Sequence, residues 1–445
     1  MDYLAAIAVI EKLLKERSVE GYEIMLGTSR NLSVEVKEQK VDTFKCSTPV
    51  GVSIRVLRNG GMGFSYSTSL EERALSRMID NAVIGAASQT PDEFYGFPEP
   101  QTYREMPDIF DGEMAGVDEA EKVARAMELE RLALAFDPRV KRVRKATYGE
   151  SNYEVMIVNS RGVRGSYRGT SVSSSVSVVA EEGDDSQMGW DFGFSPRFSG
   201  VDVAAVAASA ASKAVGGLGA RRISTMRCPV VLDNHVATEF LEVLAPSFLA
   251  EHVLKQKSLL AGRTGELLFA PCLSIRDDGT LSGGMATTPF DGEGVAHRNT
   301  TLVAEGVVQG FLYDTLYARK LGTDSTGNST RGGVKGAPHM GVTNFFIENG
   351  RTPPADLCAG IERGMLITDV IGMHTANPIS GDFSVGAAGF LIEGGTITAP
   401  VRGVAIAGNV IELFRNVEQV GNDLRFYGSV GAPALRIAAL DVSGE

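Results

Sequence analysis

One stretch of the chain, DNHVATEFLEVLAPSFLAEHVLKQKSL (233–259), gathers side chains that can bind zinc or transfer protons. It contains two histidines and three glutamates: His235, His252, Glu239, Glu242 and Glu251. Residues four apart on a helix lie on the same side, so His235 and Glu239 could contribute to a metal site. A zinc helix, however, normally supplies two ligands and keeps a glutamate free as a base, and the HExxH motif is absent here.

A helix must position these side chains. The apolar run CPVVL (228–232) predicts a strand, and the apolar spacing after it predicts a helix over residues 234–258. The apolar and polar residues of this helix fall on opposite faces: Val236, Phe240, Val243 and Leu244 against His235, Glu239 and Glu242. Pro246 removes a backbone donor and would displace any ligand that follows it. We therefore favour a solvated or subunit-facing polar stripe over a metal patch.

The other chemistry-bearing residues stand apart in the sequence. His297, His339 and His374 have no second ligand at metal-binding spacing, and a lone loop histidine is more often a hydrogen-bonded structural residue. The GxSxG, P-loop and GxGxxG motifs are absent. The segment SGDFSVGAAGF (380–390) lacks the lysine of a phosphate-binding loop. It either binds a peptide backbone through its amides or forms a tight turn between strands.

The composition is that of an acidic globular protein. Of 445 residues, 43% are hydrophobic and 22% charged, and the formal net charge is −12 without any basic block. A surface of this sign repels phosphate backbones, so direct nucleic-acid binding is not expected. Four scattered cysteines without a CxxC pair predict reduced thiols. The N-terminal residues have the pattern of an amphipathic helix rather than of a signal peptide. The longest apolar run, in 201–219, contains a lysine, so we expect a cytoplasmic protein without a membrane segment.

The order of elements divides the chain into three segments. Residues 1–105 run helix, strands, helix; residues 106–221 repeat this order; and short strands with frequent glycine dominate residues 222–445. Helices are expected at 2–17, 67–88, 117–136 and 201–219, strands at 23–29, 32–44 and 51–67, and a proline-rich linker at 91–110. The sequence thus predicts an α+β fold: two small helix-flanked antiparallel-sheet α/β units followed by a large β-rich, glycine-rich C-terminal domain.

Long blocks after residue 222 resemble a known family. The run FDGEGVAHRNTTLVAEGVVQGFLYDTLYARKLGTDSTGNSTR (290–331) resembles the central block of the TldD/PmbA family, often labelled modulators of DNA gyrase. Three further blocks are similar: GVTNFFIENG (341–350), NPISGDFSVGAAGFLIEGG (377–395) and VAIAGNVIELFRNVEQVGNDL (404–424). The resemblance covers nearly the whole chain.

The resemblance also implies which branch of the family this is. In the TldD branch, a zinc peptidase, the helix carries HExxxH and a cysteine near the C-terminus supplies the third ligand. With AGRTGE (261–266) as the anchor, Glu242 is kept but the two histidine positions are Leu241 and Pro246, and no cysteine follows Cys358. Loss of all three ligands is the pattern of the PmbA (TldE) branch, the non-catalytic subunit, in which Glu242 would be vestigial or structural.

The resemblance therefore implies a non-catalytic subunit of a TldD/TldE-type zinc metalloprotease complex that acts in peptide maturation and in proteolysis of small unfolded peptides. A TldD-like partner would hold the zinc, and this chain would bind no cofactor. Homo-oligomers are possible when the partner is absent, and the sequence leaves open whether they form. Glycine-dense strands suit an extended peptide, which makes one short segment the expected substrate contact: Gly381, Asp382, Phe383 and Ser384.

Two alternatives remain open. The chain is a metallopeptidase in its own right with non-standard ligands drawn from His235, Glu239, His297 or His339. Or it is a protein-binding modulator of DNA gyrase, which its acidic surface would restrict to contact with protein rather than with DNA.

Overall fold

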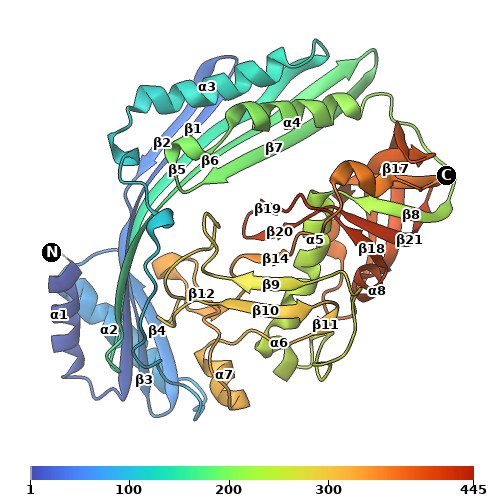
Figure 1. The fold of residues 1–445 in the computed structure, drawn as a ribbon. Coiled ribbons are helices and arrows are strands. Elements are labelled where there is room, and N and C mark those ends of the chain that lie inside the picture. The colour runs from blue at the N-terminus through green and yellow to red at the C-terminus, as the bar shows by residue number, and fades with distance from the viewer. Residues whose placement is uncertain (1–2, 445) are drawn as a thin grey trace.

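A long, curved antiparallel sheet arches beside a β-rich C-terminal domain in the computed structural model, which describes residues 3–444 (Figure 1). The sheet contains seven strands in the order β4-β3-β1-β5-β6-β7, and β2 pairs with β1. Its strands are β1 (Gly21–Lys37), β2 (Lys40–Ser47), β3 (Val50–Arg58), β4 (Gly61–Ser67), β5 (Val140–Asn159), β6 (Arg164–Glu182) and β7 (Asp185–Ser195). Its helices are α1 (Tyr3–Leu14), α2 (Glu72–Ala87), α3 (Glu119–Ala135) and α4 (Val203–Gly216).

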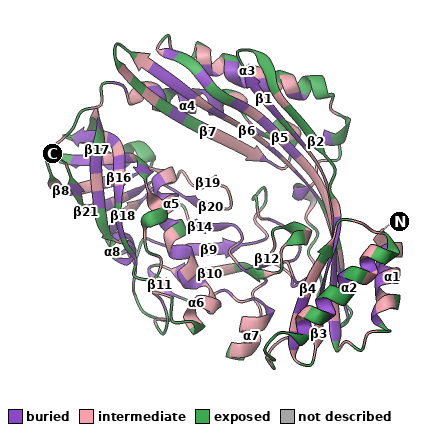
Figure 2. Ribbon diagram, turned by 180° about the vertical axis from the view of Figure 1, so that it is seen from behind, coloured by how far each residue is buried: buried purple, intermediate pink, exposed green. Residues whose placement is uncertain are grey.

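The four helices cover one face of this sheet. Along β1, Ile24 and Leu26 are buried in the core that includes α1 and α2, whereas Leu32 and Val34 are buried in the core that includes α3 and α4. These even-numbered side chains point to the same side, because side chains alternate along a strand. The opposite face of the sheet is turned toward the C-terminal domain (Figures 1 and 2).

The two predicted α/β units share this one sheet. Strand β1 of the first unit pairs with β5 of the second, from Glu23↔Asn159 to Val36↔Ala146. Each unit keeps the expected helix, strands, helix order, and each pair of helices has its own core. The α+β class is confirmed, whereas the expected segment boundaries stay a prediction. The first residue of the expected N-terminal helix, Asp2, lies outside the described residues.

The strand expected at 32–44 is instead a hairpin. The chain reverses at Glu38 and Gln39, whose φ angles are 54° and 55°, and β1 and β2 pair on either side. Glu130 of α3 accepts hydrogen bonds from both backbone N–H groups, at 2.8 and 2.7 Å. Because the turn contains neither glycine nor asparagine, the sequence carries no turn signal here.

The C-terminal domain contains two six-stranded sheets and a small two-stranded one. The first has the order β11-β10-β9-β14-β20-β19; the second has the order β17-β16-β15-β8-β21-β18 and closes on itself because β17 also pairs with β21. The strands are β8 (Met226–Leu232), β9 (Ile275–Asp278), β10 (Asn299–Ala304), β11 (Val307–Val308), β12 (Ser329–Thr330), β13 (His339–Met340), β14 (Phe345–Ile347), β15 (Arg363–Ile371), β16 (Asp382–Glu393), β17 (Thr396–Asn409), β18 (Val417–Val420), β19 (Arg425–Tyr427), β20 (Val430–Ala432) and β21 (Leu435–Ser443). The helices are α5 (Asn234–Leu244), α6 (Ala250–Leu254), α7 (Thr315–Leu321) and α8 (Val410–Arg415).

The helix expected at 234–258 is broken. Helix α5 ends at Leu244, a 3-10 turn follows, and the short helix α6 begins at Ala250. Pro246 lies in the turn, where its missing N–H and its ring end the α-helical hydrogen-bond ladder. The prediction of one continuous helix is therefore wrong after Leu244.

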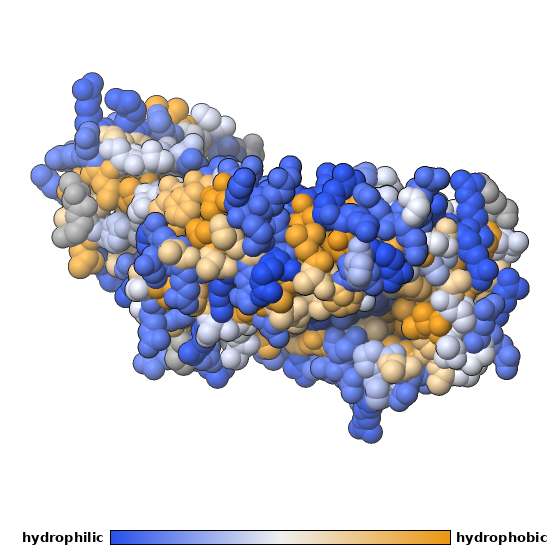
Figure 3. All heavy atoms as spheres, turned by 90° about the horizontal axis from the view of Figure 1, so that it is seen from above, coloured by the Kyte–Doolittle hydropathy of each residue, from blue (hydrophilic) through white to orange (hydrophobic). Residues whose placement is uncertain are grey.

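Helix α4 packs as a core helix. The stretch Phe198–Gly216 is long and apolar enough to cross a membrane by length and composition. In the structure it lies on β6 and β7 with a face of small side chains buried: Ala207, Ala210, Ala211 and Ala214. At Gly189 of β7, an added Cβ would lie 2.1 Å from the carbonyl oxygen of Ala210, so only glycine allows this close approach. Seen from above, hydrophilic side chains cover much of the surface, with apolar patches between them (Figure 3).

Buried charges join the sheet to the C-terminal domain. Arg55 of β3 lies 2.5 Å from Glu23 of β1 and 2.8 Å from Glu293, and Arg331 also pairs with Glu23. None of these four side chains is more than 9% exposed. Burial alone would raise the pKa of Glu23, but the guanidinium groups of Arg331 and Arg55 hold that pKa below its usual value. We refer to Glu23, Arg55, Glu293 and Arg331 as the interdomain ion network.

Candidate functional site

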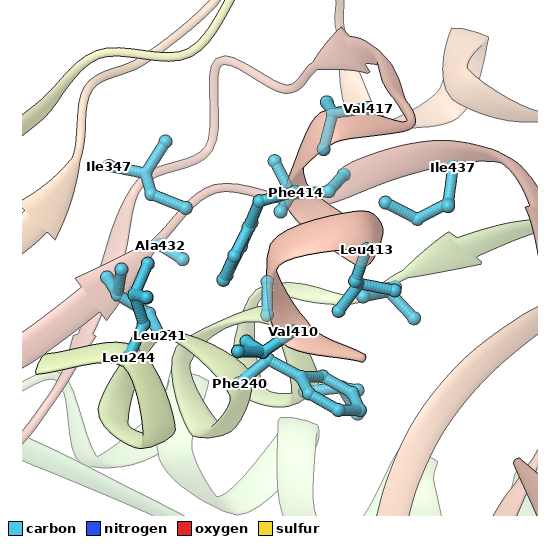
Figure 4. Close-up of a cluster of buried hydrophobic side chains, with 14 of the residues drawn as sticks. Phe240, Leu241, Leu244, Ile347, Val410, Leu413, Phe414, Val417, Ala432 and Ile437 are labelled. Atoms are coloured by element: carbon cyan, nitrogen blue, oxygen red, sulfur yellow. The ribbon is translucent and has the colours of Figure 1, made fainter. Parts of the chain in front are cut away.

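The residue aligned with the first zinc histidine lies in an apolar core. Leu241 is fully buried, and with Leu244 it projects from α5 into a cluster that contains Phe414 and Ala432 (Figure 4). Further members come from α5, α8 and both large C-terminal sheets: Phe240, Ile347, Val410, Leu413, Val417 and Ile437. Hydrocarbon side chains neither ligate zinc nor hydrogen-bond a metal-bound water, so this environment does not suit a metal ion.

The other positions aligned with the zinc motif lie apart from that core. Glu242 is on the exposed side of α5, and Pro246 is in the turn that ends the helix. Cys358, the last cysteine of the chain, is buried in a separate small cluster with Leu357 and Ile361. The geometry therefore brings together none of the ligands that the TldD pattern would need.

His235, at the start of the polar side of α5, packs against β7 and β19, whereas Glu242 on the same side is exposed. Nε2 of His235 lies 3.3 Å from Oε1 of Glu239, and the imidazole ring packs against Trp190 and Tyr427, with ring centroids 5.3 and 4.7 Å away. Burial lowers the pKa of His235 to about 4 and, together with the Asp369 carboxylate, raises the pKa of Glu239 to about 7. The imidazole is therefore neutral at pH 7, so its contact with Glu239 is not an ion pair between opposite charges. Of the two alternatives expected for the polar stripe, solvated or subunit-facing, the solvated one is wrong for His235, whose side chain is 13% exposed.

Charged residues that the sequence did not single out surround this histidine. Asp191 of β7 lies 2.5 Å from Arg425 of β19, which also donates a hydrogen bond to the Phe192 carbonyl at 2.9 Å. Lys213 of α4 donates to the Trp190 carbonyl at 3.4 Å. Strand β7 lies at the edge of its sheet, and these basic side chains donate hydrogen bonds to backbone carbonyls of this edge strand. No local sequence motif predicts these contacts, because the two residues of each contact are more than 20 residues apart along the chain.

The remaining candidate ligands do not assemble around α5. His297 is half-buried, and its ring lies against Gly279, where an added Cβ would come within 2.6 Å of it. His339 is exposed, and its Nε2 lies 3.1 Å from the hydroxyl of Thr330. Across residues 3–444, no group of three or more histidine, cysteine, aspartate or glutamate side chains has a geometry that could hold a metal ion.

Of the four predicted substrate-contact residues, Asp382, Phe383 and Ser384 begin β16 and Gly381 directly precedes it, so segment 380–390 is mostly strand rather than loop. Gly381 has a φ of +81°, and Asp382 accepts a hydrogen bond from Asn409 at 2.9 Å. Phe383 is 5% exposed and packs on Phe240 with a centroid distance of 4.7 Å, whereas Ser384 is exposed. Their role as substrate contacts stays a prediction.

Replacing Glu239 with glutamine is expected to stabilise the fold at pH 8 and to change its stability little at pH 5. The folded pKa of about 7 lies above the ordinary 4.5, so the stability that depends on the neutral carboxyl is present at low pH and is lost as pH rises through 7. Glutamine mimics the neutral form at every pH. Unfolding free energies at the two pH values test this, with Glu113→Gln, an exposed site, as the control. A Glu239→Gln variant that is less stable than the parent chain at pH 8 would contradict the raised pKa of Glu239.

Family models match most of the chain. PmbA/TldA metallopeptidase domain 1 matches residues 22–86, the central domain matches 113–218, and the C-terminal domain matches 225–444. An uncharacterized protein of Methanocaldococcus jannaschii is 30% identical over 96% of this chain and 98% of its own length. The chain belongs to the PmbA/TldD metallopeptidase family. The resemblance expected from the sequence blocks is thus confirmed.

Other relatives carry more specific names. Metalloprotease PmbA of Escherichia coli O157:H7 is 27% identical over 96% of this chain and 93% of its own length. The crystal structure of TldE from Thermococcus kodakarensis matches with a TM-score of 0.90 and 26% identity, covering 98% of this chain and all of that one. A Thermotoga maritima structure, named for a proposed role in modulating DNA gyrase, has a TM-score of 0.90 and 27% identity, covering 99% of this chain and all of its own.

Proposed function

We propose that this chain is a non-catalytic subunit of a TldD/TldE-type zinc metalloprotease complex. The observation that carries the proposal is the burial of Leu241 among hydrocarbon side chains at the position where a zinc peptidase of this family would have its first histidine. Pro246 occupies the second histidine position, and α5 ends before it. The high structural similarity to a TldE supports the same branch of the family.

In this proposal, the zinc and the catalytic machinery belong to a TldD-like partner subunit. This chain binds no cofactor, pairs with the partner through the β-rich C-terminal domains, and can form homo-oligomers when the partner is absent. Both subunits act in the cytoplasm on peptides rather than on nucleic acid, which agrees with a net charge of −12.

The substrate is an extended, unfolded peptide, because strands hold a peptide through its backbone and need few specific side-chain contacts. The exposed Asp382 and Ser384 would face the peptide, whereas Gly381 is buried and Phe383 belongs to the core. The complex would thereby trim precursor peptides and degrade small unfolded ones.

The direct experiment is to co-express this chain with the TldD-like subunit encoded in the same genome. We expect the two to co-purify, and we expect peptide cleavage only by the pair, with complete loss of activity in the presence of a zinc chelator. Cleavage by the isolated chain at the rate of the pair would overturn the proposal. Co-purification with DNA gyrase instead of a TldD-like chain would favour the gyrase-modulator alternative.

A further inference from the structure

A pocket of about 370 Å³ lies between the long sheet and the C-terminal domain, beside the start of α5. Its apolar lining includes Trp190 of β7, Phe390 of β16 and Val401 of β17. Trp190 is 43% exposed and its neighbour Met188 is 59% exposed, so two large apolar side chains face open space. An apolar group of a ligand would remove this surface from water, which is favourable.

The basic side chains that line the pocket already have partners. The ammonium group of Lys213 lies 4.0 Å from the Asp191 carboxylate and donates to the Trp190 carbonyl. Arg402 lies 3.0 Å from Asp185. An anionic ligand would therefore compete with existing contacts for both cations.

Two carboxylates of the pocket have no such partner. Asp369, exposed on β15, makes no salt bridge within the described residues, and Lys213 attracts it only from a distance. Asp233 caps α5 by accepting a hydrogen bond from the Val236 N–H at 2.8 Å, and Asp369 repels it. Desolvation raises the pKa of both carboxyls. Each of the two also raises the pKa of the nearby Glu239 carboxyl by charge repulsion. Within the described residues, these two carboxyl groups thus lie beside an aromatic wall without a basic side chain in salt-bridge contact with either of them.

We propose that this pocket binds the amino terminus of an unfolded peptide, with the ammonium group at Asp369 and Asp233 and the first side chain against Trp190 and Phe390. A terminal ammonium is separated from the first side chain by a single carbon atom, so one residue satisfies the charged and the apolar walls together. A lysine side chain, in contrast, carries its charge at the end of its own apolar stem. This inference rests on the proposed role in peptide processing.

Trp190 makes the proposal directly testable, because it is the only tryptophan of the 445 residues. The full-length chain is titrated with the peptide Leu-Ala-Gly-Ala-Gly while tryptophan fluorescence is recorded, and with the same peptide acetylated at its amino terminus. We expect saturable binding of the free peptide and at least about tenfold weaker binding of the acetylated one. Asp369→Asn should weaken binding of the free peptide to a similar extent, whereas Asp324→Asn, exposed and outside the pocket, should leave it unchanged.

Three results would overturn the proposal: equal binding of free and acetylated peptides, unchanged affinity in Asp369→Asn, or equally tight binding of an acetylated peptide that carries an internal lysine. Asp369 is exposed, so Asp369→Asn should fold, and its unfolding midpoint verifies this. Co-purification of Asp369→Asn with the TldD-like subunit separates the two proposals. If the variant chain pairs normally but the parent chain shows no peptide binding, this inference fails and the subunit role stands.

Discussion

Replacing Leu241 with histidine is expected to destabilise the chain by about 3–5 kcal/mol and to create no zinc site. Leu241 is fully buried and packs in the core around α5. The variant therefore loses apolar burial and places a polar ring among hydrocarbon side chains. Even with one motif histidine restored, Pro246 still occupies the second position.

Urea unfolding and zinc content test this prediction together. Leu241→Met, which keeps the side-chain volume, serves as the control and should cost less than about 1.5 kcal/mol. A Leu241→His variant that is as stable as the parent chain and binds zinc would show that α5 keeps a usable metal-binding frame.

Replacing Arg55 with methionine is expected to cost about 3–5 kcal/mol of unfolding free energy, because it leaves the buried Glu293 carboxylate without its paired cation. Arg55 lies between Glu23 and Glu293 at the centre of the interdomain ion network. Arg331 still pairs with Glu23, but Glu293 loses the guanidinium group that holds it. The long sheet should then open from the C-terminal domain before either part unfolds.

Hydrogen exchange and urea unfolding separate these events. The control is Arg30→Met, because Arg30 forms an ion pair of 3.1 Å with Glu119 in which the two side chains are 42% and 53% exposed. Exposed pairs of this kind contribute about 0–1 kcal/mol. If Arg55→Met lowers the unfolding free energy no more than Arg30→Met does, the interdomain ion network does not hold the sheet to the C-terminal domain.

The sequence predicts elements well where local patterns decide them. The alternation on both sides of Gly60 and Gly61 predicts the antiparallel strands in 51–67 where β3 and β4 form. The apolar spacing of 67–88 predicts α2, although no side chain caps its N-terminus. The turn at Glu38 and Gln39 escapes prediction because Glu130, far along the chain, supplies its hydrogen bonds. A local pattern carries no information about that partner.

The same limit applies to the site. The helical periodicity correctly places Val236, Phe240 and Leu244 in the core. It does not predict that Leu241 is buried, and it places Val243 in the core although that side chain is only half-buried. Sheets on more than one side of α5 widen its buried face beyond the single stripe of an ordinary surface helix. The environment of His235 depends on Trp190 of β7 in the same way, and only the fold brings these residues together.

The most direct test of the central claim is the zinc content of the chain purified alone, without exposure to metal-affinity resin. The assignment to a non-catalytic subunit predicts well below one zinc ion per chain, with zinc appearing only when the TldD-like partner is present. One tightly held zinc ion per isolated chain would contradict it, and the search for ligands would then begin with His235, Glu239, His297 and His339.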